Sequence, residues 1–296
     1  MDARAQRIKR VLVITFFLNI LVSGVKIFLG YSINSVAVVS DGFHSLYDGL
    51  SNVIGYIGVA LSSAPPDEKH PYGHRKFETI FAISIGVLIC LTCFEIFRKS
   101  IQSLADKKVP EITASVFGII FMTLIINIFV NRYEVAMGKK LRSEFLLADA
   151  GHTASDIFIT IGAMLGLLLC KLGVHGADAV TGLLVGFMVA LVGYRIIKDS
   201  IDILVDTVQV DKEEIKTLVM GVEGVTGCHD IRTRGTKESV FLDLHAEVEK
   251  NISIEEAHEI ADKIEEKIKQ EMPNIKDVVV HMEPKDRNVT TKEDRF

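Results

Sequence analysis

Six long apolar runs fill the first two thirds of the chain. They cover residues 11–30, 35–61, 77–97, 114–130, 145–170 and 177–197. Each is close to the length of about 20 residues that a helix needs to cross a bilayer core of about 30 Å. Hydrophobic residues make up 49% of the 296 residues, which favours a membrane protein over an ordinary soluble enzyme. The runs therefore predict an all-α, six-helix transmembrane domain over residues 1–207.

The chain becomes charged after this region. KEEIKTLVMGV has helical spacing, CHDIRTR and VFLDLHAEVE alternate like strands, and KDVVVHMEP alternates again. Between the last two strand patterns a second helix is predicted, opened by a Ser253 cap with Glu256 three residues later. The order helix, strand, strand, helix, strand predicts a small α+β domain of the ferredoxin-like kind over residues 208–296.

Lys and Arg are unevenly distributed among the connecting segments. They are frequent in residues 1–10, 62–76 and 131–142 and sparse in the loops after the first and fifth runs, whereas the loop at residues 98–113 also carries four. The positive-inside rule then places both termini and the region 208–296 in the cytoplasm, for a chain crossing the inner (cytoplasmic) membrane several times in contact with lipid. A net charge of -5 argues against nucleic acid as a partner.

One motif occurs twice within the apolar runs. DGFHSLYD (residues 41–48) and DAGHTASD (residues 149–156) both read D-x-x-H-[ST]-x-x-D. Spacings of three and four residues stack the polar side chains on one helix face, and ionisable groups at membrane depth are usually functional. The two runs are antiparallel in the predicted topology, so the copies can meet near the bilayer midplane, as in transporters built from repeats. The residues that we expect to meet are His44, Asp48, His152 and Asp156.

Two imidazoles and two carboxylates form a complete tetrahedral set for a divalent ion, with Zn²⁺ as the leading candidate. The two carboxylates also cancel the charge of the ion in a low-dielectric setting. The other interpretation is a buried Asp and His pair that only holds helices together by hydrogen bonds. Asp41 and Asp149 are either carboxylates at an entry to the site or polar residues that face a water-filled cavity.

These pairs, the segment HPYGHRKFE and the tail pattern resemble the cation diffusion facilitators, which export divalent metals against protons. The resemblance implies a loop-borne metal site at Asp67, His70 and His74, and a tail site at His229, His245, His258, His281 and Glu283. It also implies a homodimer joined through the tail. Members tuned to manganese tend to carry Asp in place of the helix-5 His, so His at both 44 and 152 resembles the zinc-preferring pattern.

The expected function is therefore efflux of Zn²⁺, with Cd²⁺, Co²⁺ and Fe²⁺ as further substrates, in exchange for protons. Zn²⁺ would be both the substrate and a regulatory or structural ion. A membrane-anchored metal sensor without transport is the alternative, although a sensor has no need of ligands at the midplane. An enzyme is not expected, because H-E-x-x-H is absent and four ligands leave no open position for water.

Overall fold

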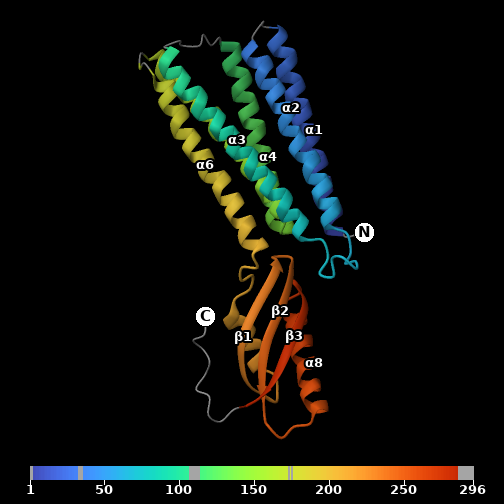
Figure 1. Cartoon of the computed structure of the whole chain (residues 1–296). Coiled ribbons are helices and arrows are strands. Elements are labelled where there is room, and N and C mark those ends of the chain that lie inside the picture. Colours follow the sequence, from blue (N-terminus) through green and yellow to red (C-terminus); the bar gives the residue numbers. More distant parts are fainter. Residues whose placement is uncertain (1–2, 33–35, 107–113, 173, 175, 286–296) are drawn as a thin grey trace. The chain divides into compact units, whose positions relative to one another are not determined.

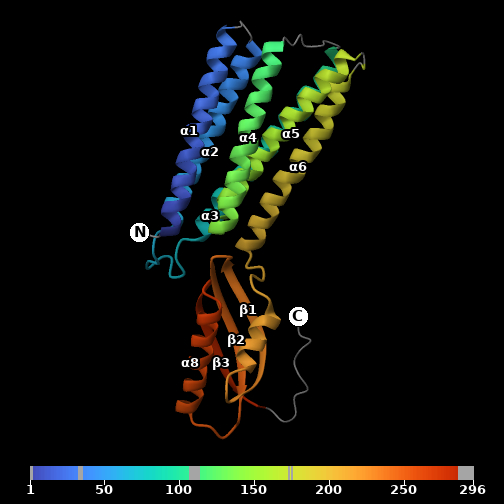
Figure 2. The ribbon, with the colours of Figure 1, turned by 180° about the vertical axis from the view of Figure 1, so that it is seen from behind.

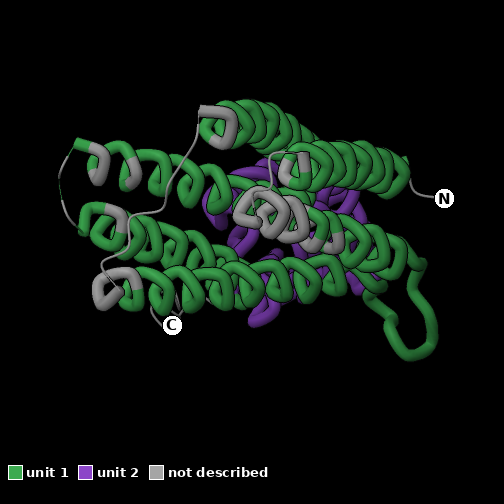
Figure 3. The backbone as a smooth tube through the Cα atoms, turned by 90° about the horizontal axis from the view of Figure 1, so that it is seen from above, with its two compact units in different colours: residues 1–201 green, residues 202–296 purple. Residues whose placement is uncertain are grey.

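The computed structural model of the chain describes residues 3–32, 36–106, 114–172, 174 and 176–285. Within these ranges the side chains of residues 30, 32, 36–45, 47, 48, 50, 103–106, 114–116, 167, 170, 171 and 178 are not described. The chain divides into two compact units, residues 1–201 and residues 202–296, which Figure 3 draws in green and purple. In the described residues, the first unit is built from helices and the second from helices and strands.

Six long helices form the first unit (Figures 1 and 2). They are α1 (Ala3–Ser32), α2 (Val36–Ser62), α3 (Lys76–Asp106), α4 (Ala114–Leu141), α5 (Glu144–Lys171) and α6 (Ala177–Leu204). Among the described residues, α1, α3, α4 and α6 each contain a segment long and apolar enough to cross a membrane, and α2 contains a shorter apolar segment. The six predicted helices are confirmed, and four of them contain a candidate membrane span in their described residues.

Three of the helices continue well past the apolar runs that predict them, and α3, predicted from the run 77–97, ends at Asp106. The run 114–130 predicts α4, but this helix continues to Leu141, and α6 continues from residue 197 to Leu204. The added segments of α4 and α6, NRYEVAMGKKL and KDSIDIL, contain no Pro and a single Gly, so little in them opposes helix formation. The length of an apolar run reflects the thickness of the bilayer, whereas the end of a helix is set by residues that break helices, such as Pro and Gly. The extension of α4 carries Glu134, which lines a polar cavity of the first unit.

α2 and α5 approach each other closely at Gly55. A Cβ atom at this position would lie 2.0 Å from Cε1 of Phe145, whose side chain is fully buried at the start of α5. Small residues allow such close approach of helices in membrane proteins. One turn earlier on α2, Ser51 also reaches α5, because its Oγ donates to Oδ1 of Asp149 over 3.0 Å. This packing places one face of α2 against the polar stretch of α5.

Arg4 connects three helices at one end of the bundle. Its Nε donates to the main-chain oxygen of Leu141 over 2.8 Å, and its Nη1 donates to Oε2 of Glu78 over 3.1 Å. The other carboxylate oxygen of Glu78 accepts a hydrogen bond from the hydroxyl of Ser143. The network therefore ties α1 and α3 to the turn between α4 and α5.

The second unit is the predicted α+β domain. It contains α7 (Lys212–Met220), β1 (Val225–Thr236), β2 (Ser239–Val248), α8 (Ile254–Glu271) and β3 (Ile275–Pro284). The sheet order is β1-β2-β3, with β1 antiparallel and β3 parallel to β2. The predicted cap is present, since Ser253 Oγ accepts from the Glu256 N–H over 3.1 Å and the Glu256 carboxylate accepts from the Ser253 N–H over 2.8 Å.

The sheet of the second unit has one packed face and one open face. Leu242 and Leu244 of β2 are buried in the same core as Ile264 of α8 and Ile215 of α7, so both helices cover their face. Side chains alternate between the faces along a strand. His245, between the buried Leu244 and Ala246, therefore belongs to the open face.

A bulge interrupts β1 beside its histidine. His229 is opposite His245, but three residues further along β1 the partner is only two residues away on β2. One extra residue is accommodated here, and Asp230 has a φ of 49°. Before the bulge the even-numbered Cys228 is buried, and after it the odd-numbered Ile231 is buried. The alternation of inward and outward side chains is therefore shifted by one residue at the bulge.

Candidate metal sites

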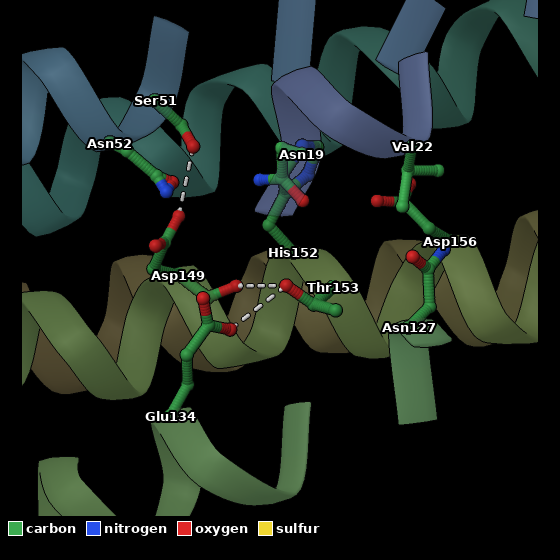
Figure 4. A pocket seen from close by; sticks show the side chains of 10 residues that line it. All are labelled: Asn19, Val22, Ser51, Asn52, Asn127, Glu134, Asp149, His152, Thr153 and Asp156. Atoms are coloured by element: carbon green, nitrogen blue, oxygen red, sulfur yellow. Dashed lines mark hydrogen bonds between the residues drawn. The ribbon is translucent and has the colours of Figure 1, made fainter. Parts of the chain in front are cut away.

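A polar cavity lies among α1, α2, α4 and α5 in the first unit (Figure 4). It is lined by Asn19, Val22, Ser51, Asn52, Asn127, Glu134, Asp149, His152, Thr153 and Asp156. Its volume is about 20 Å³. On the same scale, a cavity needs about 10–15 Å³ to hold one water molecule. All of these lining residues except Val22 carry a polar group, and none of the ten is Lys or Arg. The cavity is thus suited in polarity to a small cation, and in size to one such ion at a time.

The predicted pair on α5 lines this cavity. His152 and Asp156 are four residues apart, one helical turn, and both reach the same polar space. His152 is 7% exposed. Asn19 of α1 and Asn127 of α4 extend the cavity around them (Figure 4). An imidazole and a carboxylate at this depth provide one nitrogen and one oxygen donor for a metal ion.

The predicted partners on α2 are His44 and Asp48. Both belong to the helix Val36–Ser62, but their side chains lie outside the described residues. Asp41 of the same motif is also outside them. The meeting of the two motifs therefore stays a prediction.

Glu134 of α4 is a cavity residue that the sequence reasoning missed. It is 1% exposed, and its Oε2 accepts from Thr153 Oγ1 over 3.0 Å. Asp149 of α5, 2% exposed, lines the same cavity and accepts from Ser51. The signal for Glu134 was present, since an acidic residue follows the apolar run 114–130 by only four positions without a helix breaker between them.

The three loop residues lie together. Oδ1 of Asp67 is 3.0 Å from Nδ1 of His70, and Oδ2 of Asp67 is 3.3 Å from Nε2 of His74. The ring centroids of the two histidines are 4.4 Å apart. One donor atom from each residue fits within 4.8 Å of the others, which is the compactness that a metal site requires. The predicted triad is thus brought together before any ion binds.

The loop backbone holds the carboxylate of this triad in place. The N–H groups of His70 and Lys69 donate to Asp67 Oδ1 over 2.6 and 2.9 Å. The His70 N–H is the main cause that lowers the pKa of Asp67 below its ordinary value. Asp67 is therefore held in the ionised form that binds cations.

A second cluster lies on the open face of the tail sheet. His229, His245 and His281 occupy matched positions on β1, β2 and β3. Glu283 contacts all three: its Oε1 is 2.9 Å from His245 Nδ1 and 3.6 Å from His281 Nε2. Its Oε2 is 3.3 Å from His229 Nε2. Four of the five predicted tail ligands therefore form one cluster, with three histidines around the carboxylate of Glu283.

The charge state of Glu283 reflects these neighbours. Burial alone would raise its pKa, but the hydrogen bond from His245 and the proximity of His229 and His281 outweigh burial and hold the pKa below its ordinary value. The carboxylate is thus available as a metal ligand.

His258 is not brought into this cluster. It lies on α8, which covers the packed face of the sheet, and its side chain is 77% exposed. Its nearest ion-pair atom is Oδ2 of Asp262 at 3.9 Å. By contrast, Glu247 was not predicted, although its Oε1 lies 3.6 Å from His229 Nε2. Strand alternation could have found it, because Glu247 is two residues after His245 on the same face.

Two known families match consecutive parts of this chain. Residues 12–205 match the cation efflux transmembrane domain, and residues 208–285 match the cytoplasmic domain of cation efflux proteins. An uncharacterized transporter of Methanocaldococcus jannaschii is 34% identical over 280 residues, covering 94% of this chain and 99% of that protein.

Two further relatives have printed functions. The manganese efflux system protein MneS of Bacillus subtilis is 30% identical over 271 residues, 90% of this chain and 91% of its own. The cation-efflux pump FieF of Salmonella newport is 30% identical over 262 residues, 88% of this chain and 87% of its own. The likeness thus extends over both units.

Proposed function

Because this chain belongs to the cation efflux family, the cation diffusion facilitators, and is a membrane transporter of metal cations, we propose that it exports Zn²⁺ in exchange for protons. Cd²⁺, Co²⁺ and Fe²⁺ are further substrates in this proposal. The direction is out of the cytoplasm, with six membrane spans and both termini on the cytoplasmic side.

The observation that carries the proposal is the burial of His152 beside Asp156 in a polar cavity of the helical unit. His44 and Asp48 are proposed to complete the site from α2. Ser51 and Asn52 line the same cavity and follow Asp48 by three and four residues, the spacing of one helix face. Two carboxylates and two neutral imidazoles leave the site with no net charge when a divalent ion is bound.

Exchange for protons follows from the chemistry of the ligands. An imidazole binds a metal only in its neutral form, so arrival of the ion displaces protons from the site. When the ion leaves, protons offset the negative charge of the carboxylates and prepare the return of the transporter. An inward proton gradient can therefore drive outward movement of metal.

Preference for Zn²⁺ is proposed from the nitrogen donors of His44 and His152. Imidazole suits Zn²⁺, whereas Mn²⁺ favours oxygen ligands. The name of the relative MneS makes manganese the main competing substrate. The choice between them can be made by direct competition in a transport assay.

The loop and tail clusters are proposed to bind regulatory or structural Zn²⁺. His245, His281 and Glu283 offer three donor atoms within 4.8 Å, and Asp67 with its two histidines offers another three. The tail is also proposed to join two copies of the chain as a homodimer. A membrane-anchored sensor is the second candidate, favoured by the tail cluster alone, but it leaves the buried His152 without a role.

The test is transport by the full chain in liposomes. Zn²⁺, Cd²⁺, Fe²⁺ and Mn²⁺ are offered singly and in competition while the internal pH is followed. We expect Zn²⁺ to be moved in preference to Mn²⁺, with protons moving in the opposite direction. Metal binding without any metal flux would support the sensor instead, and flux without a pH change would overturn the exchange.

A further inference from the structure

Two carboxyl groups in the cavity have no part in the four-ligand site. Glu134 comes from α4 and Asp149 from α5, and they are 1% and 2% exposed. A buried carboxylate is costly unless a cation or a proton offsets its charge. None of the ten residues that line the described cavity is Lys or Arg. A cation or a proton must therefore offset the charge of the pair, and His152 is the one residue of this lining that can itself carry a positive charge.

Hydroxyl groups surround both carboxyls. Ser51 Oγ donates to Asp149 Oδ1 over 3.0 Å, and Thr153 Oγ1 lies 3.0 Å from Glu134 Oε2 (Figure 4). Thr153 Oγ1 is also 3.2 Å from the main-chain oxygen of Asp149. These contacts link α2, α4 and α5 through oxygen atoms alone. Each hydroxyl retains a lone pair with which it can face a cation.

Asn52 adds an independent indication of a ligand. It is 2% exposed and lines the cavity, and its Oδ1 has no hydrogen-bond partner among the described residues. A buried amide oxygen without a partner is rare in proteins. If the oxygen of the amide faces the cavity, and not the nitrogen, this oxygen is available to coordinate a cation there.

Thr15 settles which atom of Asn52 faces the cavity. The single proton of Thr15 Oγ1 is directed at the main-chain oxygens of Val11 and Leu12, each 3.2 Å away. Thr15 can then only accept from Asn52, and Nδ2 of Asn52 lies 3.0 Å from it. The amide nitrogen is held by Thr15, which is not among the cavity-lining residues, so we infer that Asn52 faces the cavity with its oxygen.

We propose that Glu134, Asp149 and Asn52 form a second cation position in the membrane unit, one helical turn along α5 from His152. Its donors are all oxygen atoms: two carboxylates, the amide Oδ1, and the hydroxyls of Ser51 and Thr153. Such a set suits hard divalent ions of the Mn²⁺ class, whereas the His and Asp site suits Zn²⁺. Binding of a cation at this position does not depend on the proposed transport. Only its role as a stage on the route of the transported ion rests on that proposal.

The experiment counts Mn²⁺ bound to the full chain in detergent by electron paramagnetic resonance, which distinguishes hydrated from bound Mn²⁺. The background variant carries His74→Ala, His245→Ala and His281→Ala, so that the loop and tail clusters are disabled. In this background, Asp156→Ala should leave one Mn²⁺ per chain within the membrane unit. Adding Glu134→Gln and Asp149→Asn should remove it.

Two single changes refine the test. Asn52→Leu removes one oxygen donor at similar volume and should weaken Mn²⁺ binding by about tenfold, the equivalent of one lost interaction with a charge. Glu144→Gln is the matched control, because this carboxylate also lies on α5 and accepts from Thr79 but is not among the cavity-lining residues. It should leave the count unchanged. Glu134→Gln keeps the shape of the side chain and an acceptor for Thr153, and the elution volume of each variant verifies folding.

The outcomes separate this proposal from the proposed function. If Glu134→Gln with Asp149→Asn leaves the Mn²⁺ count intact and alters only the protons released per metal, the pair carries protons and the cation position is wrong. If the unmodified chain binds this Mn²⁺ but moves no metal in liposomes, the transport proposal fails and the position stands. If it transports metal and the double variant loses no Mn²⁺, only the position fails.

Discussion

Nη1 of Arg4 donates to Oε2 of Glu78 over 3.1 Å, with side chains only 12% and 5% exposed. The two residues are 74 positions apart, so the pair fixes the start of α1 against the start of α3. Breaking a buried pair by removing one partner costs about 3–5 kcal/mol, because the other charge stays buried.

Arg4→Met should therefore lower the thermal midpoint of the full chain in detergent by several degrees. Arg7→Met is the control, since Arg7 is exposed one turn further along α1. Adding Glu78→Gln to Arg4→Met should recover part of the loss, because it removes the uncompensated charge. Equal midpoints for the Arg4 and Arg7 variants would show that the pair contributes little.

Asp156→Ala should abolish zinc transport while the protein still inserts and folds. The change removes one carboxylate and leaves an unbalanced positive charge when a divalent ion binds in a low-dielectric cavity. Zinc flux into liposomes is the measurement. Asp199→Ala, at an exposed position of α6, is the control and should transport normally. Normal flux through the Asp156 variant would remove this residue from the transport site.

His44→Asp should relax metal selectivity without ending transport. It replaces a nitrogen donor with a harder oxygen donor and adds a negative charge, which favours Mn²⁺ and Fe²⁺ relative to Zn²⁺. The ratio of Mn²⁺ to Zn²⁺ flux under competition should rise. An unchanged ratio would count against His44 as a ligand.

Gly55→Ala should destabilise the first unit. The added Cβ would meet the ring of Phe145 at 2.0 Å from Cε1, and overpacking of this kind costs about 1–3 kcal/mol. Gly24→Ala is a matched control on α1, because a Cβ there meets nothing within 4 Å. Thermal unfolding in detergent compares the two. A midpoint that falls equally in both variants would mean that loss of Gly, and not the contact with Phe145, is responsible.

Acid should weaken the tail sheet through Glu283. The folded-state pKa of this carboxyl is lowered, so its contribution to stability is fully present above the ordinary value of about 4.3 and is lost as the pH falls through the lowered value. The protection factors of the β3 amides, which are the intrinsic hydrogen-exchange rates at each pH divided by the measured rates, should therefore fall in this acidic window. Glu283→Gln should flatten the dependence. A variant with the same acid response as the unmodified chain would assign the response to other carboxyls.

Local patterns predicted much of this architecture. Apolar length predicted the helices, alternation predicted the strands, and Ser253 with Glu256 predicted a cap that is present. What depends on packing between elements was missed. Glu134 falls outside an apolar run but inside a buried helix, and His258 belongs to a helix on the far side of the sheet from the tail cluster. The loop triad was predicted from the family resemblance, and the structure brings its three residues together.

The bulge at Asp230 divides β1 into two segments whose inward-facing positions are out of step by one residue. Residues before it present His229 beside His245, and residues after it bury Ile231 in the core. A substitution at His229 can thus change the cluster on the open face without repacking the interior. Deleting Asp230 would couple the segments again, since one lost residue reverses the inward and outward positions on one side. The extra residue lets His229 stay on the open face while Cys228 before it and Ile231 after it both stay in the core.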